Sequence, residues 1–420
     1  MFSRTTRLLP ILLCCVFSFA QGDSPSVSPQ ARRIHDSAIV IDTHADTPQR
    51  FLDENFDIGS VTPTTKGNID LEKARAGNLG AEFFSIWVDP RSNGGHYAKR
   101  AFDLIDSVYA QASRHPNQMV MAYTAQDIVR ARSGSQKKFA ALMGVEGGHA
   151  IEDDLHILRD FYRLGVRYMT LTWSNTNEWA DSSGDIKNPE VKHHDGLTDF
   201  GRQVVREMNH LGMMVDISHV SDKTFWDTIA VTKAPVIASH SSARALCDHA
   251  RNMTDDMLKA VAKNGGVVNV NFYSAFVDDN FRKAEQEMAK DRQAAENAFL
   301  QRLKEEGKPF SYPEFDQLER EWNAKIPRPP LKSLIDQIDH IAKVAGVDHV
   351  GLGSDFDGVS GALPAGIDSA ADLPKITQGL LDRGYSSADI KKMVGGNMLR
   401  VFGEVEQVSR KMQAEEPAKN

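Results

Sequence analysis

Five histidines and acids of this sequence stand at or just after the ends of short apolar runs, and all are of types that bind metal ions. They are His44, Asp46, Glu146, His219 and His240. Imidazole nitrogens and carboxylate oxygens in combination suit zinc, with cobalt or manganese as less favoured alternatives. The carboxylate of Glu146 has two oxygens and can bridge two ions. Any one of these residues alone is better explained by ordinary packing or hydrogen bonding, so the set as a whole predicts the metal site.

A pair of divalent ions held by these residues would favour hydrolysis. Two neighbouring ions can hold a bridging hydroxide and polarise a carbonyl at neutral pH, without a protein nucleophile. Asp355 follows a fifth apolar run, 349–354. We expect Asp355 to accept a proton from the bridging water and to pass it to the leaving amine. The alternative for Asp355 is a further metal ligand or a turn-forming residue.

The apolar runs themselves are typical of buried parallel strands. Strands are predicted at 38–42, 80–88, 140–146, 166–172, 213–218, 235–239, 266–271 and 348–353. Helical patterns fall between them, at 97–114, 152–163, 198–211, 222–230, 254–263 and 331–345. This alternation predicts an α/β fold, a (β/α)8 TIM-type barrel. Such barrels build their sites at the carboxyl ends of the strands, where the ligand-type residues stand.

Residues 278–330 interrupt the alternation after the seventh predicted strand, on the side of the barrel that carries the site. The segment 278–306 is dense in charges and helix formers. Two interpretations remain open: a solvated helical hairpin without a role, or a lid or subunit contact. We expect a single metallohydrolase domain at 34–410 that contains this insertion, followed by a polar tail at 411–420.

The N-terminal segment 1–20 has the pattern of a secretory signal peptide. Arg4 and Arg7 precede a short apolar core, and small residues stand where cleavage would occur. A lipoprotein signal at Cys14 is the weaker alternative. Residues 21–33 are expected to form a disordered linker by composition. The sequence therefore predicts a periplasmic or secreted protein.

Composition argues against several classes of partner. The chain has a formal net charge of −8, and loss of the leader with its two arginines would make the charge −10. No basic stripe is present, so nucleic acid is not an expected partner. After the leader no apolar run reaches the roughly 18 residues of a membrane span, so no integral membrane segment is expected. Cys247 would remain as a lone cysteine, better explained by packing than by nucleophilic chemistry.

Ten short motifs along the chain point to one family. They are DTHAD (42–46), GVEGGH (144–149), RYMTLT (167–172), WAD (179–181), DISHVS (216–221), SHSSA (239–243), RN (251–252), VNVNF (268–272), GLGSDFDG (351–358) and GNMLRVF (396–402). With them the chain resembles the renal (membrane) dipeptidase family of dinuclear zinc hydrolases, in its secreted bacterial form. The resemblance runs from about residue 39 to residue 405.

The resemblance implies a role for each matching residue. His44 and Asp46 would bind the first zinc ion, and His219 and His240 the second. Glu146 would bridge both ions, and Asp355 would be the proton-transferring acid/base. Arg251 would pair with the terminal carboxylate of the substrate, a role that a guanidinium fork suits. Without the resemblance, a loop arginine is more often a solvated surface charge.

One position departs from the family pattern. In well-studied mammalian members a substrate-contacting histidine follows the Leu-Thr pair of the fourth strand, whereas Trp173 stands there in this chain. An indole cannot bind a metal or titrate, and donates only one N–H. The departure affects substrate choice and the stabilisation of the tetrahedral intermediate. Compensation by His149, His193 or His194 and plain packing of Trp173 are both open.

The leading hypothesis is a dipeptidase with two zinc ions, which hydrolyses dipeptides by attack of a bridging hydroxide. The family accepts D-residues at the carboxyl side and can open some β-lactams, so the resemblance implies such activity. The main alternative keeps the site but acts on N-acyl amino acids or lactams, and Trp173 motivates it. A less favoured alternative is a non-catalytic protein that captures metal or peptide. Family members often form homodimers, which the resemblance allows here.

Overall fold

The strands of the chain close into a parallel barrel. The computed structural model describes residues 26–60, 67–91, 94–308 and 310–415, so the predicted signal peptide lies outside the described residues. Eight strands follow the order β2-β1-β9-β8-β7-β6-β5-β4, and pairing of β2 with β4 closes the ring. They are β1 (Val40–Ala45), β2 (Leu79–Trp87), β4 (Phe139–Glu146), β5 (Val166–Thr170), β6 (Met214–Asp216), β7 (Ile237–Ala238), β8 (Val267–Asn271) and β9 (Val350–Gly353). Each overlaps a predicted strand, and the predicted TIM-type barrel is confirmed.

The barrel strands are apolar on both faces because both faces are covered. Inward side chains such as Ile41, Phe83 and Tyr168 fill the interior in one buried cluster. Outward side chains such as Phe84 and Val145 belong to a second cluster, which they share with the surrounding helices. This double burial explains why the strands appear in the sequence as continuous apolar runs without polar alternation.

Six surrounding helices match the predicted helical segments. They are α4 (Tyr97–Arg114), α6 (Leu155–Arg163), α7 (Asp199–Leu211), α8 (Asp222–Val231), α9 (Asp255–Asn264) and α13 (Leu331–Ala345). The hydroxyls of Thr198, Ser221 and Thr254 accept a hydrogen bond from a first-turn amide and so cap α7, α8 and α9. Helices α7 and α9 end at the left-handed residues Gly212 and Gly265.

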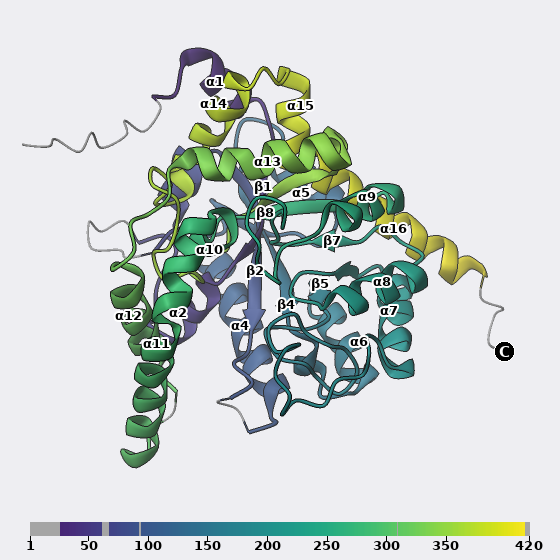
Figure 1. The fold of residues 1–420 in the computed structure, drawn as a ribbon. Coiled ribbons are helices and arrows are strands. Elements are labelled where there is room, and N and C mark those ends of the chain that lie inside the picture. The colour runs from purple at the N-terminus through teal and green to yellow at the C-terminus, as the bar shows by residue number, and fades with distance from the viewer. Residues whose placement is uncertain (1–25, 61–66, 92–93, 309, 416–420) are drawn as a thin grey trace, which may run out of the picture.

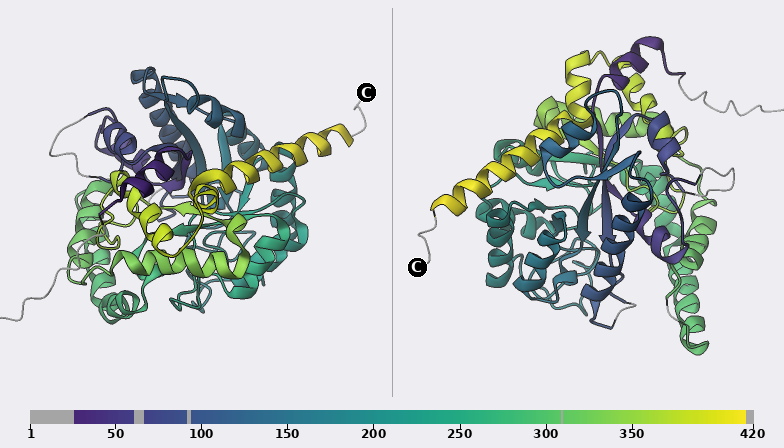
Figure 2. Two further views of the ribbon diagram at one scale, coloured as in Figure 1. Left: turned by 90° about the horizontal axis from the view of Figure 1, so that it is seen from above. Right: turned by 180° about the vertical axis from the view of Figure 1, so that it is seen from behind.

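Several further elements were not predicted. They are β3 (Met119–Met121), α1 (Pro29–Asp36), α2 (Thr47–Asp53), α3 (Leu71–Ala76), α5 (Ala125–Ala131), α14 (Pro374–Asp382), α15 (Ser387–Lys391), α16 (Asn397–Glu415) and the turns η1 (Gly148–Ile151), η2 (Val347–His349), η3 (Ala370–Asp372) and η4 (Lys392–Gly396). Helix α16 covers the end of the barrel where the strands begin: its Met398 and Phe402 join the interior cluster. Figure 2 shows α16 crossing the barrel and projecting beyond it.

The predicted linker 21–33 is wrong at its C-terminal end. Helix α1 begins at Pro29, and the hydroxyl of Ser28 accepts a hydrogen bond from the amide of Ala31 as its N-cap. Ala31 and Ile34 are buried, so the helix docks on the domain through a small apolar face. The composition of this segment predicted a linker because only two apolar residues of α1 are buried, too few to show a helical pattern in the sequence. The predicted polar tail is helical as far as Glu415.

The insertion forms two helices on one side of the barrel, α11 (Asp279–Glu305) and α12 (Tyr312–Asn323). The short helix α10 (Ser274–Val277) directly precedes it. In Figure 1, α11 and α12 lie side by side beside α2, and the far end of α11 projects from the body of the protein. A small apolar cluster of Ala275, Phe281, Ile326 and Ala362 joins the insertion to the loop after β9. Among the described residues no helix combines the length and apolarity needed to cross a bilayer.

Gly144 tests the packing of the barrel interior. A methyl group at this position would lie 2.0 Å from Cζ of Tyr168, whose side chain is fully buried. We expect Gly144→Ala to lower the free energy of unfolding by about 1–3 kcal/mol, because the ring cannot move without distorting its neighbours. Urea denaturation followed by circular dichroism would measure the change.

Gly403→Ala in α16 is the matched control. The added methyl would be 4.0 Å from its nearest neighbour, Cβ of Ala125. Alanine is preferred to glycine inside a helix by up to about 1 kcal/mol, so this variant should be as stable as the wild type or more so. Equal midpoints for Gly144→Ala and the wild type would contradict the packing described here.

Candidate metal centre

The predicted ligands all lie at one mouth of the barrel. His44 is part of β1 and Glu146 is the last residue of β4. The other predicted ligands, and Asp355, follow β1, β6, β7 and β9 within three residues of the strand end. Because the strands are parallel, their carboxyl ends meet on one side. The structure thus brings together residues that are up to about 300 positions apart in the sequence.

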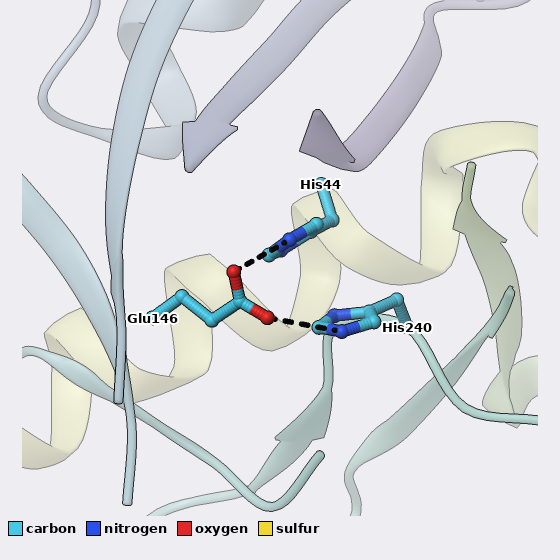
Figure 3. A group of neighbouring side chains, drawn as sticks. All are labelled: His44, Glu146 and His240. Carbon is cyan, nitrogen blue, oxygen red and sulfur yellow. Dashed lines mark ion pairs between the residues drawn. The ribbon is translucent and has the colours of Figure 1, made fainter. Parts of the chain in front are cut away.

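The carboxylate of Glu146 lies at the centre of the group. Its Oε2 is 3.3 Å from Nε2 of His44, and its Oε1 is 2.9 Å from Nε2 of His219 and 3.5 Å from Nε2 of His240. Figure 3 shows one oxygen directed toward His44 and the other toward His240. Nε2 of His44 is also 3.6 Å from Oδ2 of Asp46. The arrangement offers two adjacent ligand groups that share Glu146.

Hydrogen bonds behind two of the imidazoles fix which nitrogen faces the centre. Nδ1 of His44 lies 2.9 Å from the hydroxyl of Tyr168, which donates its own proton to the carbonyl of Thr43. Nδ1 of His240 lies 2.8 Å from the hydroxyl of Ser239, which donates to Asp216. Each hydroxyl oxygen therefore accepts a hydrogen bond from the Nδ1–H of its histidine. The Nε2 lone pairs of these two rings point into the group of ligands, as metal-binding histidines require.

Asp216 organises the strand ends that carry His219 and His240. This fully buried carboxylate accepts hydrogen bonds from the hydroxyls of Thr170 and Ser239, each at 2.6 Å. It also accepts from the backbone amides of Ser218 and Ser239, at 3.0 and 2.8 Å. Sequence reasoning did not assign Asp216 a role. Its position within the DISHVS motif, three residues before a ligand, was the available signal.

Burial controls the protonation of these side chains. Desolvation lowers the pKa of His219 to about 3 and holds that of His240 well below its usual value, so both imidazoles are neutral at pH 7. Burial raises the pKa of Asp46 to about 7 and also raises that of Asp355. A bound cation favours the neutral form of an imidazole and the ionised form of a carboxylate. It would therefore stabilise His219 and His240 as they are and keep Asp46 and Asp355 ionised.

The donor set fits divalent metal ions. Nε2 of His44 is buried and has no hydrogen-bond partner. The Nε2 atoms of His219 and His240 face one another at 2.9 Å. Ligand atoms of His44, Glu146 and His240 lie within 4.8 Å of one another, as do those of His44, Asp46 and Asp355. Three imidazoles and three carboxylates at one buried point are the mixture of nitrogen and oxygen ligands that zinc binds.

Asp355 is held against this centre by a tight loop. Its carboxylate accepts a hydrogen bond of 2.9 Å from the side-chain amide of Asn271, and its backbone is left-handed with φ 61°. Gly358 closes the loop, and a Cβ there would lie 2.2 Å from Oδ2 of Asp46 and 2.6 Å from Oδ1 of Asp355. Only a glycine leaves room for both carboxylates at this point.

Helix α12 of the insertion fixes the same loop. Tyr312 donates its hydroxyl proton to the carbonyl of Asp357 at 2.7 Å, and the side-chain amide of Asn323 donates to the carbonyls of Val359 and Ser360 at 3.3 and 3.2 Å. Asp357 and Ser360 have φ values of 63° and 47°, an unfavourable conformation for residues other than glycine. The insertion therefore packs against the loop that carries Asp355 through α12. A role as a lid or a subunit contact stays a prediction.

A cleft of about 360 Å³ opens above the ligands. Asp46, Glu146, His219 and Asp355 line it, while His44 and His240 lie buried beneath. Aromatic residues also line it: Trp87, Trp173, Tyr273, Phe276, Tyr312 and Phe315. The insertion supplies Arg292, Glu296, Asp316, Glu319 and Asn323. The cleft is therefore bounded by the barrel mouth on one side and the insertion on the other.

Trp173 lies in the cleft, and its ring centre is 5.0 Å from that of Trp87 and 6.3 Å from that of His219. None of the three histidines considered as replacements lines the cleft as the described residues form it. His149 is buried and bonds to the carbonyl of Val88 through Nε2. His194 bonds to the carbonyl of Asn177, and His193 lies 3.8 Å from the carboxylate of Asp181.

Arg251 lies in the cleft beside the ligands and is not a solvated surface charge. Its side chain donates to the carbonyl of His240 at 3.0 Å and to the hydroxyl of Ser241 at 3.1 Å, and it lies over the ring of Phe276. The residue is only 6% exposed, and burial lowers its pKa to about 10, so it keeps its charge at neutral pH. A buried guanidinium in a cleft is suited to binding a carboxylate.

Tyr312→Phe tests the contact between α12 and the Asp355 loop. Loss of one buried hydrogen bond is worth about 1–1.5 kcal/mol, which corresponds to roughly a tenfold fall in kcat on a peptide substrate if the loop positions Asp355. Metal content should not change. Tyr385→Phe removes a similar bond of 2.9 Å to Asp339, away from the cleft, and should leave kcat unchanged. Equal kcat values for Tyr312→Phe and wild type would contradict a positioning role.

Comparison with known proteins agrees with the geometry. The sequence profile of the membrane dipeptidase family, peptidase family M19, matches residues 28–416. Dipeptidase 3 of Mus musculus is 31% identical over 399 residues, which cover 94% of this chain and 70% of that protein. Dipeptidase aclJ of Aspergillus oryzae is 35% identical over 352 residues, which cover 82% of this chain and 72% of that protein.

Solved structures show the same fold. The probable dipeptidase PvdM from Pseudomonas aeruginosa superposes with a TM-score of 0.75 at 27% identity, and the match covers 90% of this chain and 98% of that one. A metallopeptidase from Rhodobacter sphaeroides, liganded with a phosphinate mimic of the dipeptide L-Ala-D-Ala, has a TM-score of 0.68 at 22% identity, with 88% and 99% covered. Together with the profile match, these relatives show that the chain belongs to the membrane dipeptidase family, peptidase family M19, and is a metallopeptidase that hydrolyses peptide bonds.

Proposed function

We propose that this protein is a dipeptidase with two zinc ions and that it accepts dipeptides with a C-terminal D-residue. The observation that carries the proposal is the Glu146 carboxylate between two groups of ligands, beneath a cleft that also contains a buried arginine. One group is His44 and Asp46, and the other is His219 and His240. The identity and number of the ions rest on the chemistry of this donor set.

The metal ions would supply the activated water and the polarised carbonyl of hydrolysis. The protein residues bind and orient the substrate and move protons. Arg251 offers a fixed positive charge beside the ligands, which would hold the terminal carboxylate of the dipeptide. Its bonds to the His240 carbonyl and the Ser241 hydroxyl fix its direction. The peptide bond would then lie over Glu146 and Asp355.

Asp355 is the residue best placed to transfer the proton. Its carboxylate lies beside Asp46 at the cleft, and Asn271 holds one of its oxygens. Burial raises the pKa of Asp355, which makes it a better proton acceptor than a solvated carboxylate. Asp355 would take a proton from the attacking water and deliver it to the leaving amine.

The proposed tolerance of a D-residue draws on a structural relative. The metallopeptidase from Rhodobacter sphaeroides was solved with a mimic of L-Ala-D-Ala, a dipeptide whose C-terminal residue has the D-configuration. The resemblance of this chain to the dipeptidase family implies the same tolerance. We also propose a periplasmic or secreted location from the leader at 1–20, and a homodimer remains a prediction.

Trp173 supports a second candidate, a metal-dependent amidohydrolase of N-acyl amino acids or lactams. The indole lies in the cleft beside Trp87, where it adds apolar surface and provides no titratable group. Such a surface suits an acyl chain in place of an N-terminal amino acid. The ligand set and Arg251 would serve this reaction equally, so the two candidates differ in substrate only.

A substrate panel separates the two candidates. We expect the zinc-loaded enzyme to hydrolyse L,L-, L,D- and Gly-containing dipeptides with higher kcat/KM than N-acyl amino acids, measured by amine release. Asp355→Asn should keep its metal and lose turnover by a factor of about 10² to 10⁴, because it cannot transfer a proton. Turnover of acyl substrates alone would favour the second candidate. Wild-type turnover by Asp355→Asn would contradict the assigned proton transfer.

A further inference from the structure

A second cavity lies at the opposite end of the barrel from the metal centre. It has a volume of about 440 Å³ and includes Leu79 and Phe139, the first residues of β2 and β4. The metal ligands lie at the other ends of the strands, so the two cavities are separated by the barrel interior. We call this second cavity the basal cavity. It shares no lining residue with the cleft.

All the charged side chains that line the basal cavity are positive. Arg75, Arg132 and Lys137 line it, and no acid does so among the residues that the structure describes. None of the three cations forms an ion pair within the described part of the chain. Neighbouring Arg130, by contrast, pairs with Asp127. Three unpaired cations in one hollow are unexpected in a chain whose formal charge is −8.

Arg132 is the most constrained of the three cations. It lies across the start of β2, where a Cβ on Gly80 would be 2.9 Å from its Nε. That Nε is buried and has no hydrogen-bond partner, while Nη2 donates to the side-chain oxygen of Asn78 at 2.7 Å. Desolvation lowers the pKa of Arg132, with no nearby carboxylate to offset the effect. A partly buried charge without a counter-ion is unfavourable unless an anion is bound.

The remaining polar lining supplies neutral hydrogen-bond donors. Asn117, Gln118 and Ser135 line the same cavity as the three cations, and these three polar residues are exposed to solvent. Amide and hydroxyl groups donate to phosphate oxygens as readily as they do to water. The combination of a guanidinium fork, an ammonium group and neutral donors is the chemistry of a phosphate site.

We propose that the basal cavity binds a phosphate-type oxyanion, carried either by a soluble phosphorylated compound or by a phospholipid head group. Three unpaired cations match a phosphate group better than they match a single carboxylate, because its negative charge, about −1.5 to −2 in a monoester and about −1 in a lipid diester, is spread over several oxygens. The Arg132 guanidinium and the Lys137 ammonium would contact the oxygens, and Arg75 would complete the charge. The site does not depend on the proposed dipeptidase activity.

Titration calorimetry with inorganic phosphate tests the site in the metal-loaded full-length enzyme. We expect Arg132→Gln to weaken phosphate binding at the basal cavity at least tenfold, and Lys137→Gln to weaken it severalfold. Arg130→Gln is the matched control, because Arg130 lies two positions away and already has a partner in Asp127. Its affinity for phosphate should stay within twofold of the wild type.

Phosphate can also bind at the metal centre and add to the calorimetric signal. Inhibition of peptide hydrolysis measures that second binding event separately. Inhibition of peptide hydrolysis by phosphate should be the same in wild type and Arg132→Gln, because the basal cavity is remote from the cleft. Lys137 is exposed, so Lys137→Gln tests the site even if Arg132→Gln fails to fold. Identical calorimetric titrations for wild type, Lys137→Gln and Arg130→Gln would overturn the proposal.

Vesicle sedimentation distinguishes the two sources of phosphate. If the ligand is a lipid head group, wild type but not Lys137→Gln will sediment with phosphatidylcholine vesicles that contain phosphatidylglycerol, and inorganic phosphate will compete. If the ligand is soluble, phosphate will bind in calorimetry while the vesicles do not retain the protein. Either result supports a phosphate site, whereas absence of both kinds of binding contradicts it.

Discussion

The burial of the Glu146 carboxylate among three imidazoles is the interaction on which the rest of the site depends. Its two oxygens face different histidines, at 3.3 Å from His44 and 2.9 Å from His219. A buried carboxylate among imidazoles is stable only when a positive charge lies beside it, and the raised pKa of His44, to which Glu146 contributes, shows how strongly this site favours one. A bound metal ion would supply that charge, and the barrel provides the rigid frame that holds the side chains together.

Behind the ligands, buried polar groups form hydrogen bonds that fix the orientation of the ligand side chains. Asp216 accepts four hydrogen bonds at the ends of β5, β6 and β7, and through Ser239 it fixes the ring of His240. On the other side of the cleft, α12 holds the loop after Asp355 through Tyr312. The insertion thus contacts a loop beside the metallopeptidase site, and its hydrogen bonds restrain a backbone that is unfavourable by itself.

Much of this architecture could be predicted from sequence because its signals are local. Buried strands appear as apolar runs, and His44 and Glu146 stand at their ends, so barrel and ligands were both predicted. Contacts between distant segments leave no such signal. The bond from Tyr312 to Asp357 joins an insertion to a loop 45 residues away. The environment of Arg251 was equally hidden, because a loop arginine has the same sequence whether it is buried or solvated.

We propose that this site holds two metal ions that share Glu146, and crystals of the zinc-loaded enzyme, with anomalous diffraction measured at the zinc edge, would show them. We expect two anomalous peaks about 3.5–4 Å apart, each about 2.0–2.2 Å from one oxygen of Glu146. One peak should adjoin His44 and the other His219 and His240. A single peak, or peaks that do not contact Glu146, would rule out a pair of ions bridged by this carboxylate.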